Sequence, residues 1–522
     1  MKYFNVAGPC SEQKHYMINA STRLDGVEEL IDNEQYFVIH AARQSGKTTY
    51  LQDLSKRLNN EGKYYALYCS LEKAQNVVQP ERGIPTILDC IVLSLQKSSS
   101  IPFVYDEQYE QEKKNRPLVL LTLFLMNFVK TLDKPLVILF DEADCLSEGT
   151  LISFLRQLRD GYNDRSIASF VHSVALVGMR NIRDYKAQIR LNSQSLGSAS
   201  PFNIATESLT LNNFTKEEII QLYQQHTTET GQIFANNAIE LVHKQTQGQP
   251  WLVNAIAREV IVKILQSDYK KPVTAKLVNE AIQNIILRRP THIDSLLERL
   301  KEEQVRKIIE PMILGDDSID EESDDFLYTK DLGLIRIDND QITPANPIYS
   351  EVIVRKLSSA TQSELQHSQY PYEIPRYLTK NKSIDMVFLM RDFQQFWREN
   401  SRACIKNYKQ YKEAAPHLVL MAFLQRVVNG GGQIIREMAV GSGRLDLCLV
   451  YNGQKYPIEL KIRYGKKYLE KGLEQTANYI DICGCKEGWL VIFDRRVRVK
   501  WDDKIFMKKK TINGKKITIV GL

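Results

Sequence analysis

Apolar runs alternate with amphipathic stretches along the first 180 residues of the chain. In chain order, the apolar runs and the helical patterns between them lie at 36–39, 64–69, 85–97, 117–131, 136–140, 151–161 and 173–178. Short runs that lack polar alternation are typical of strands buried on both faces of a parallel sheet. Strands that alternate with helices predict an α/β fold whose parallel sheet is joined by right-handed crossovers.

A small-residue turn follows the first apolar run and leads into a helix that begins near Lys47. This order of strand, turn and helix N-terminus is that of a phosphate-binding loop, whose backbone N–H groups point at phosphate oxygens. Lys47 would reach the β- and γ-phosphates of ATP, and the hydroxyl of Thr48 would hold Mg²⁺. The residues predicted to line the nucleotide site in this loop are Ala41, Arg43, Gln44, Ser45, Gly46, Lys47, Thr48 and Thr49.

Ala41 stands where such loops usually begin with glycine. Alanine tolerates a positive φ less well than glycine, so we expect the loop either to open in a right-handed conformation or to accept slight strain. The alternative interpretation of the whole motif is a chance Gly-Lys-Thr sequence that happens to follow a core strand.

Carboxylates come directly after the apolar run at 136–140, at Asp141, Glu142 and Asp144. Open α/β sheets bind their ligands at the carboxyl ends of the strands. We therefore expect Asp141 to hold Mg²⁺ through water and Glu142 to polarise the water that attacks the nucleotide. A strand that ends in a solvated acidic turn explains this motif alone, but it does not explain both motifs together.

Arg180 follows the apolar run at 173–178, so it would project near the phosphates. A polar residue at that place can sense the γ-phosphate of a nucleotide. A solvated surface charge is the alternative interpretation of Arg180.

These segments resemble AAA-like ATPases of the branch that also holds STAND and archaeal-type P-loop ATPases. The residues that carry the resemblance lie at 41–49, 140–144 and 176–185. The resemblance implies a small helical lid after the core, and residues 206–266 fit it. Thr215 and Glu218 form a capping-box pattern there. Pro250, in a Gly-Gln-Pro sequence, matches the lid segment that closes over the nucleotide in such ATPases, although it also fits an ordinary helix start.

Residues 286–360 resemble a winged helix, with a helix, a two-strand wing and a final helix at 347–357. Winged helices can bind DNA, but a packing or hinge role is the interpretation we favour, since fold does not settle function. A stretch rich in Ser, Gln, Pro and Asn then predicts a linker. The predicted domains are an ATPase core at 1–205, a lid at 206–285, a winged-helix-like domain at 286–360, a linker with a helix at 361–400, and a last domain at 401–522.

The last domain carries a second group of chemically reactive residues on three predicted strands. Asn452 and Gly453 form a strong hairpin signal between two of them. Asp446 and Glu459 therefore lie on adjacent antiparallel strands, and Lys461 shares a face with Glu459. Two carboxylates in this arrangement can bind one or two Mg²⁺ ions that polarise a phosphodiester, while the lysine stabilises the attacking hydroxide.

This pattern resembles the PD-(D/E)xK nuclease superfamily. Gln475 with a tyrosine four residues later matches a feature of its exonuclease-like branch, and Glu413 stands at the acidic position of the first helix. The resemblance implies a restriction-endonuclease-like α/β domain in which Glu413, Asp446 and Glu459 are metal ligands, and in which Gln475 acts with them and the lysine. Leucine rather than proline precedes Asp446. A solvated surface cluster on a hairpin is the alternative.

Composition restricts where a nucleic-acid surface can lie. The net charge is only +6, so such a surface must be local. Ten lysines and arginines crowd residues 495–516, with Trp501 and Phe506 between them. Clustered cations with aromatics suit contact with DNA. Lysines that protect an exposed strand edge are the alternative explanation.

The remaining features predict a cytoplasmic protein without a membrane segment. The N-terminus has no apolar signal core, and the apolar stretch at 118–129 is too short to span a bilayer. The 8 cysteines form no zinc pattern, so we expect free thiols.

Together these features predict an ATPase whose nucleotide state controls a DNA nuclease, in defence or mobile-element biology. The alternative is a nucleotide-switch scaffold whose last domain binds nucleic acid or protein without cutting. The sequence leaves homo-oligomer formation open.

Overall fold

The computed structural model describes most of the chain, in two compact units. The described residues are 1–19, 23–105, 111, 113, 116–179, 204–288, 290–314, 319–338, 341–353, 356, 377–379, 381, 383–407, 415–428, 432–440, 443–463, 468–496 and 499–522. The N-terminal unit comprises Met1–Asp294 and Glu321–Tyr349, and the C-terminal unit comprises Ser295–Asp320 and Ser350–Leu522.

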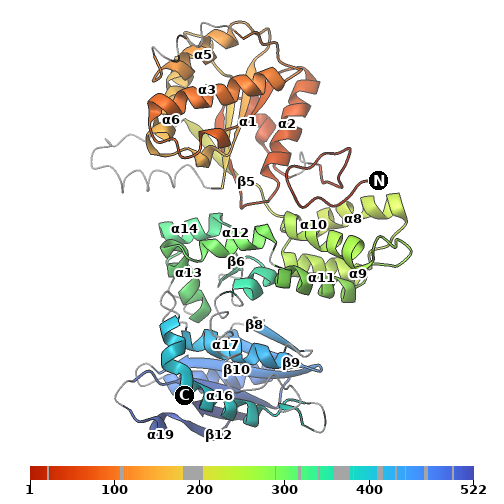
Figure 1. Ribbon diagram of the computed structural model, residues 1–522, viewed down its shortest axis with the longest axis vertical. Coiled ribbons are helices and arrows are strands. Elements are labelled where there is room, and N and C mark those ends of the chain that lie inside the picture. Colours follow the sequence, from red (N-terminus) through yellow and green to blue (C-terminus); the bar gives the residue numbers. More distant parts are fainter. Residues whose placement is uncertain are drawn as a thin grey trace. The chain divides into compact units, whose positions relative to one another are not determined.

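Five parallel strands form the sheet of the N-terminal unit, in the order β2-β3-β4-β1-β5. Figure 1 shows this sheet among its helices, with β5 labelled. The strands are β1 (Tyr36–His40), β2 (Tyr65–Ser70), β3 (Leu136–Asp141), β4 (Ser173–Gly178) and β5 (Ala205–Thr210). Every residue of β3 and β4 is buried. The parallel α/β sheet predicted from the apolar runs is thus confirmed.

Strand β5 was not predicted, because its residues lack an apolar run. It pairs with β1 at the edge of the sheet, from the pair Tyr36 and Ala205 to the pair His40 and Thr210. An edge strand needs a backbone partner on one side only, so it tolerates polar side chains. The lid boundary predicted at residue 206 therefore falls inside a strand of the core sheet.

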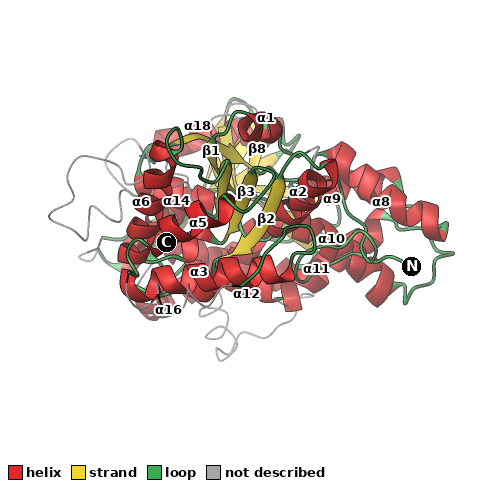
Figure 2. Cartoon of the chain, turned by 90° about the horizontal axis from the view of Figure 1, so that it is seen from above, coloured by secondary structure: helices red, strands yellow, loops and turns green. Residues whose placement is uncertain are grey.

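Helices cover both faces of this sheet. One face packs against α3 (Pro80–Lys97), α5 (Leu120–Val129) and α6 (Glu148–Asp164). The other face packs against α1 (Val27–Asp32) and α2 (Lys47–Glu61), and Figure 2 shows the strands between α5 and α2. Two short 3₁₀ turns, η2 (Glu72–Ala74) and η3 (Ala143–Cys145), follow β2 and β3.

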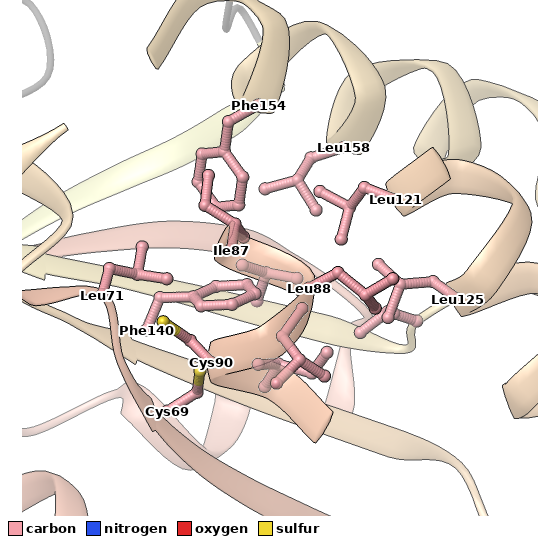
Figure 3. Close-up of a cluster of buried hydrophobic side chains, with 14 of the residues drawn as sticks. Cys69, Leu71, Ile87, Leu88, Cys90, Leu121, Leu125, Phe140, Phe154 and Leu158 are labelled. Carbon is pink, nitrogen blue, oxygen red and sulfur yellow. The ribbon is translucent and has the colours of Figure 1, made fainter. Parts of the chain in front are cut away.

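The first of these layers is a continuous apolar core (Figure 3). Phe140 of β3 lies edge-on to Phe154 of α6, with ring centroids 5.2 Å apart. The residues labelled around them are Cys69, Leu71, Ile87, Leu88, Cys90, Leu121, Leu125 and Leu158. Within the apolar stretch at 118–129, Leu120–Val129 form the largely buried helix α5, whereas Leu118 and Val119 are exposed. Helices pack on both faces of the sheet, so they hold its carboxyl edge, where β1 and β3 end, in a fixed place.

A helical segment follows β5. Its helices are α8 (Lys216–Thr230), α9 (Asn236–Thr246), α10 (Pro250–Arg258), the π-helical turn η4 (Glu259–Ile264), α11 (Ala275–Arg288), α12 (Thr291–Arg299) and α13 (Glu303–Leu314). The predicted capping box opens α8: Glu218 N donates to Thr215 Oγ1 at 3.2 Å, and Thr215 N donates to Glu218 Oε2 at 2.7 Å. At α10, the side chain of Gln249 accepts from Leu252 N at 2.6 Å, and Pro250 is the first helical residue.

The segment predicted to be winged-helix-like contains α14 (Asp324–Asp331), an antiparallel pair of β6 (Ile335–Asp338) and β7 (Gln341–Pro344), and helical residues at 347–353. The winged-helix assignment itself stays a prediction. The acidic residues Asp324 and Asp325 belong to α14. They form the first turn of α14 after the N-cap Ser323, where carboxylates are favoured by the exposed backbone N–H groups.

The C-terminal unit contains a six-stranded mixed sheet in the order β12-β13-β11-β10-β9-β8. Its strands are β8 (Gly432–Val440), β9 (Gly443–Tyr451), β10 (Gln454–Ile462), β11 (Glu487–Phe493), β12 (Phe506–Ile512) and β13 (Lys515–Gly521). Strands β8, β9 and β10 are antiparallel neighbours, whereas β10, β11 and β13 run parallel. The carboxyl ends of β10, β11 and β13 therefore share one edge.

Four helices accompany this sheet: α16 (Met386–Asn407), α17 (Ala415–Val428), α18 (Tyr468–Ile482) and the short α19 (Trp501–Lys504). Helix α18 connects β10 to β11 and buries Leu473 and Ile480 against Leu490 and Ile492. The predicted hairpin is confirmed, since Asn452 (φ 47°) and Gly453 (φ 76°) both take the left-handed conformation of a tight β-turn.

Among the helices that the structure describes, none is long and apolar enough to cross a bilayer. The cysteines whose side chains the structure describes are free thiols, namely Cys10, Cys69, Cys90, Cys145, Cys448, Cys483 and Cys485.

Candidate functional site

The loop between β1 and α2 has two left-handed positions. Gly46, with φ 95°, is the N-cap residue of α2, and Gln44 has φ 59°. Ala41 is not among the residues with positive φ, so the strain expected as one alternative at this position is absent. Arg43 and Gln44 are exposed, whereas Ser45 is 2% exposed. The loop therefore turns through Gln44 and Gly46 and not through its first residue.

Lys47 begins α2 with its ammonium group enclosed by this loop. Its Nζ donates to Ala41 O at 2.8 Å and to Ala42 O at 2.9 Å. Burial lowers the pKa of Lys47, and the nearby charges of Asp144 and Glu142 oppose that shift. The loop lysine and the carboxylates after β3 therefore share one site, as the sequence predicts.

The next residue, Thr48, joins α2 directly to the end of β3. Its Oγ1 donates to Asp141 Oδ2 at 2.7 Å, and Tyr68 OH donates to the same oxygen at 3.0 Å. Asp141 is 1% exposed, and its Oδ1 accepts from Glu142 N at 3.0 Å. Tyr68 was missed, because a strand pattern at 64–69 does not show which side chain will face the neighbouring strand.

Glu142 takes a left-handed backbone conformation, with φ 59° and ψ 34°. A residue other than glycine pays about 1–3 kcal/mol for such a conformation, which persists where the surrounding structure enforces it. Although the side chain reaches solvent, partial burial of its carboxylate raises the pKa of Glu142, and the charges of Asp141 and Asp144 add to this shift.

Asp144, which follows β3, also contacts the end of β4. Its Oδ2 accepts from Met179 N at 3.1 Å. Its Oδ1 is buried without a hydrogen-bond partner among the described residues. A Cβ atom on Gly178 would lie 2.8 Å from that oxygen, so only glycine leaves room for the Asp144 side chain.

Arg23 is a further residue that sequence reasoning missed. Its Nη1 donates to Ser45 O at 3.1 Å, and its Nη2 donates to Asn212 O at 2.5 Å. The guanidinium lies 4.8 Å from the ring centroid of Phe214, and desolvation lowers its pKa to about 10. Arg23 thus connects the phosphate loop to the segment after β5. A lone arginine ahead of α1 carries no motif that could have identified it.

Four further residues were predicted at the nucleotide site: Thr49, Gln44, Pro250 and Arg180. Thr49 Oγ1 accepts from Cys10 N at 2.9 Å, so it binds the N-terminal segment. Gln44 O accepts from Gln249 Nε2 at 3.4 Å, which brings the residue before Pro250 to the loop. Contact of Pro250 itself with a nucleotide stays a prediction, and Arg180 lies outside the described residues.

The loop residues fit a nucleotide with Mg²⁺. Ser45 Oγ is buried and has no hydrogen-bond partner within the described ranges, so it can accept a further polar group. The hydroxyl of Thr48 and the carboxylate of Asp141 are hard oxygen donors that already lie together, as Mg²⁺ requires. Lys47 supplies a cation beside them.

The C-terminal unit brings Glu459 and Lys461 together on β10. Lys461 Nζ lies 2.6 Å from Glu459 Oε1, with 23% and 1% of the two side chains exposed. The register of β9 and β10 ends with Ile458 opposite Leu447, the immediate neighbours of Glu459 and Asp446. Asp446 belongs to β9, but its side chain lies outside the described residues, as does all of Glu413.

Helix α18, which carries Gln475, packs against β10 near Lys461. A Cβ atom on Gly472, one turn before Gln475, would lie 3.2 Å from Lys461 Cγ. Gln475 Oε1 is buried and has no hydrogen-bond partner in the described part of the chain. No group of three or more His, Cys, Asp or Glu residues that could hold a metal occurs among the described residues, which do not include Glu413 or the Asp446 side chain.

Comparison with known proteins identifies the N-terminal part of the chain. The profile of a family described as an AAA-like domain matches residues 7–354. The Walker-type ATPase PABY2304 of Pyrococcus abyssi aligns with a TM-score of 0.47 and 14% identity, over 67% of this chain and 99% of its own. Cdc6p of Pyrobaculum aerophilum aligns with a TM-score of 0.36 and 14% identity, over 66% of this chain and 94% of its own.

RuvB, the Holliday junction branch migration motor of Thermotoga maritima, aligns with a TM-score of 0.32 and 12% identity, over 64% of this chain and 92% of its own. A search among curated proteins gives no match. The family match covers more than half of the chain, and it includes the whole five-stranded sheet and the loop at Lys47. The chain therefore belongs to the family of proteins with an AAA-like P-loop ATPase domain.

Proposed function

We propose that this protein binds and hydrolyses ATP, and that its nucleotide state regulates a Mg²⁺-dependent PD-(D/E)xK-type DNA nuclease in its C-terminal unit. The family assignment and the Thr48–Asp141 contact support the ATPase part. The observation that carries the nuclease part is the buried Glu459 paired with Lys461, one strand away from Asp446.

In the proposed ATPase site, the loop amides and Lys47 bind phosphate oxygens, while Thr48 and Asp141 hold the magnesium ion. Bound Mg²⁺ would supply charge neutralisation on the phosphates. Glu142 orients the attacking water and accepts its proton. Its raised pKa makes it a better base near neutral pH than an ordinary carboxylate.

In the proposed nuclease site, Asp446 and Glu459 hold the metal ion, joined by Glu413. Lys461 positions and stabilises the hydroxide that attacks the phosphodiester, and Gln475 orients the substrate from α18. Bound metal would lower the pKa of the attacking water. Glu459 is 1% exposed and Lys461 is 23% exposed, so the lysine is the member of this pair that reaches solvent.

A cleavage assay on the full-length protein tests this function. Plasmid and linear DNA are incubated with Mg²⁺ or Mn²⁺, with and without ATP. We expect metal-dependent cutting whose rate changes with ATP, and a loss of about 100-fold or more in Asp446→Asn and in Lys461→Ala. Lys455→Ala is the matched control, since it removes an exposed lysine from the other end of β10.

The variant Lys47→Ala separates the two halves of the proposal. It should keep metal-dependent cutting and lose the effect of ATP. Wild-type protein that binds Mg²⁺ but cuts neither DNA under any of these conditions contradicts the nuclease part. Unchanged cutting in Asp446→Asn contradicts the assignment of the site.

A second candidate is a nucleotide-switch scaffold whose C-terminal unit binds nucleic acid or protein without cutting. The close ion pair of Lys461 with the buried Glu459 is also consistent with this candidate, because such a pair occurs as a purely structural contact in other proteins. DNA binding that is unaffected by divalent metal and by Asp446→Asn, without cleavage, would select this candidate.

A further inference from the structure

Tyr68 of β2 lies on the face of the sheet that α2 covers. Strands β2 and β3 pair in parallel, with Tyr68 opposite Leu139 and Ser70 opposite Asp141. Tyr68 packs against the core that contains Leu139 on this face. Alternate residues of a strand share a face, so Asp141 lies on it too, two residues after Leu139. The Tyr68 hydroxyl reaches this carboxylate and donates to its Oδ2 at 3.0 Å.

Hydrogen bonds to both of its oxygens fix the orientation of the Asp141 carboxylate. Its Oδ1 accepts from Glu142 N at 3.0 Å, and its Oδ2 accepts from Thr48 Oγ1 at 2.7 Å as well as from Tyr68 OH. An ionised carboxylate offers about four acceptor positions, so these donors still leave room for a metal ion or for a water molecule that the ion carries. Because both oxygens are held, rotation of the carboxylate about its Cβ–Cγ bond would break at least one hydrogen bond.

Helix α2 contacts Asp141 and Tyr68 with two of its side chains. Gln52 lies one helical turn after Thr48, and its side chain hydrogen-bonds to the hydroxyl of Tyr68. Residues four apart on a helix lie on the same face, so α2 presents Thr48 and Gln52 together to β2 and β3. Thr48 is assigned to Mg²⁺ in the proposed site, whereas Tyr68 lies between Gln52 and Asp141. Tyr68 is therefore placed to hold the carboxylate and not the metal ion.

We propose that Tyr68 is a positioning residue, which orients Asp141 for the magnesium ion of Mg²⁺–ATP and so raises the affinity for Mg²⁺–ATP but not for ATP alone. This inference rests on the proposed ATP site. It adds a residue that touches neither the nucleotide nor the metal ion and acts through Asp141.

The chemistry of Mg²⁺ makes such orientation important. This ion requires nearly ideal octahedral geometry, whereas Ca²⁺ accepts flexible geometry. Groups that orient the ligands of a metal ion commonly change its affinity by about 10-fold to 100-fold. Phenylalanine at position 68 would keep the aromatic ring and its packing but would lose the hydroxyl. The substitution Tyr68→Phe therefore separates the orientation of Asp141 from the packing of the core.

Isothermal titration calorimetry of ATP binding to the full-length protein tests this inference. The titration is performed in EDTA, in Mg²⁺ and in Ca²⁺. Tyr68→Phe should bind ATP in EDTA as the wild type does, and should bind Mg²⁺–ATP at least about tenfold more weakly. The loss with Ca²⁺–ATP should be smaller, because Ca²⁺ tolerates a less exact carboxylate position. In an Asp141→Ala background, Tyr68→Phe should cause no further loss, since its only path to the metal ion is then absent.

Tyr65→Phe is the matched control. It removes a tyrosine hydroxyl from the same strand, and this hydroxyl also donates to an aspartate, at 2.8 Å to Asp133 Oδ1. Asp133 precedes β3 and so lies at the opposite edge of the sheet from Asp141. All three affinities of Tyr65→Phe should equal those of the wild type. Circular dichroism establishes that each variant is folded. Gln52→Met keeps the test valid if Tyr68→Phe does not fold, and it should weaken Mg²⁺–ATP binding about threefold.

The outcomes separate this inference from the proposed ATP site. Wild-type Mg²⁺–ATP affinity in Tyr68→Phe overturns the inference and leaves the ATP site standing. Equal losses in EDTA, Mg²⁺ and Ca²⁺ also overturn it, because they indicate that Tyr68 only supports the local fold. An equal loss in Tyr65→Phe, or a further loss in the Asp141→Ala background, has the same meaning. A wild-type protein that does not bind ATP, or that binds it without dependence on Mg²⁺, contradicts the ATP site and the inference with it.

Discussion

At the scale of single residues, the phosphate loop depends on a glycine that no other residue can replace without cost. Gly46 has φ 95°, a conformation that L-residues rarely adopt. A Cβ atom there would also lie 3.2 Å from Arg23 Nη1. A side chain at position 46 would therefore strain the backbone and also press against Arg23, the cation that binds the loop.

Gly46→Ala tests this role against a matched glycine at the other end of the same helix. Gly62 is the C-cap of α2 with φ 77°, and a Cβ there would meet nothing closer than Lys134 Nζ at 3.8 Å. Each substitution should lower the free energy of unfolding by about 1 kcal/mol. Only Gly46→Ala should also weaken ATP binding, by at least about tenfold, as measured by isothermal titration calorimetry. Equal ATP affinity in both variants would contradict the role of Gly46.

At the scale of packed elements, His292 in the first turn of α12 is enclosed between other helical residues. Its ring lies 4.7 Å from that of Trp251 in α10, and its Nε2 lies 2.7 Å from Tyr349 OH. It is 5% exposed, and Nδ1 has no hydrogen-bond partner among the residues that the structure describes. Burial, and then the charge of Arg43, lower the pKa of His292 to about 4.

This burial predicts acid sensitivity of the packing between α10 and His292. The histidine pKa is lower in the folded state than its ordinary value of 6.5, so the unfolded state binds more protons as pH falls. The stabilisation is complete above pH 6.5 and is lost toward pH 4, by up to about 3 kcal/mol. Native-state hydrogen exchange of α10 should show this loss in the wild type and a flatter pH profile in His292→Phe.

His243→Phe, at the half-buried end of α9, is the control for this measurement. Its pH profile should match that of the wild type. An α10 whose stability is constant between pH 7 and pH 4.5 would show that His292 does not govern the packing.

At the scale of the whole molecule, the proposed regulation requires that ATP binding in the N-terminal unit change the stability or conformation of the C-terminal unit. A ligand present at about 100 times its Kd stabilises the unit that binds it by about 2.7 kcal/mol. Hydrogen exchange with Mg²⁺ and ATP should therefore increase protection of β1–β5. Regulation predicts a measurable change in β8–β13 as well, because coupling between sites needs a difference in free energy between states.

Lys47→Ala, which weakens nucleotide binding, should remove both changes and serves as the control. If protection increases only in β1–β5 of the wild type, the protein binds ATP. That result contradicts regulation of the C-terminal unit by nucleotide.

The parts of the fold that were predicted correctly are those with a strong local pattern. Strand β3 is a continuous apolar run, so its burial on both faces could be predicted from the sequence. Asn452 and Gly453 predicted their hairpin correctly, because few other residue pairs tolerate two left-handed positions. Strand β5 was missed because an edge strand is stabilised by backbone pairing with β1, which leaves little trace in its side chains.

The candidate sites follow the same division. The residue types at Lys47, Thr48 and Asp141, and at Glu459 and Lys461, were enough to predict chemistry, because phosphate and metal ions require particular donor groups at short spacings. Tyr68 and Arg23 have no such local pattern. Each acquires its partners from segments distant in the sequence, such as Asn212 for Arg23, which lies 189 residues away.

The order of residues along the chain was therefore enough to define an α/β P-loop domain and to predict the donor groups of two candidate sites, since those depend on local periodicity and spacing. Only tertiary packing decided which residues hold these groups in place. A hydrogen bond such as that of Tyr68 to Asp141 exists only once two strands have aligned in a particular register.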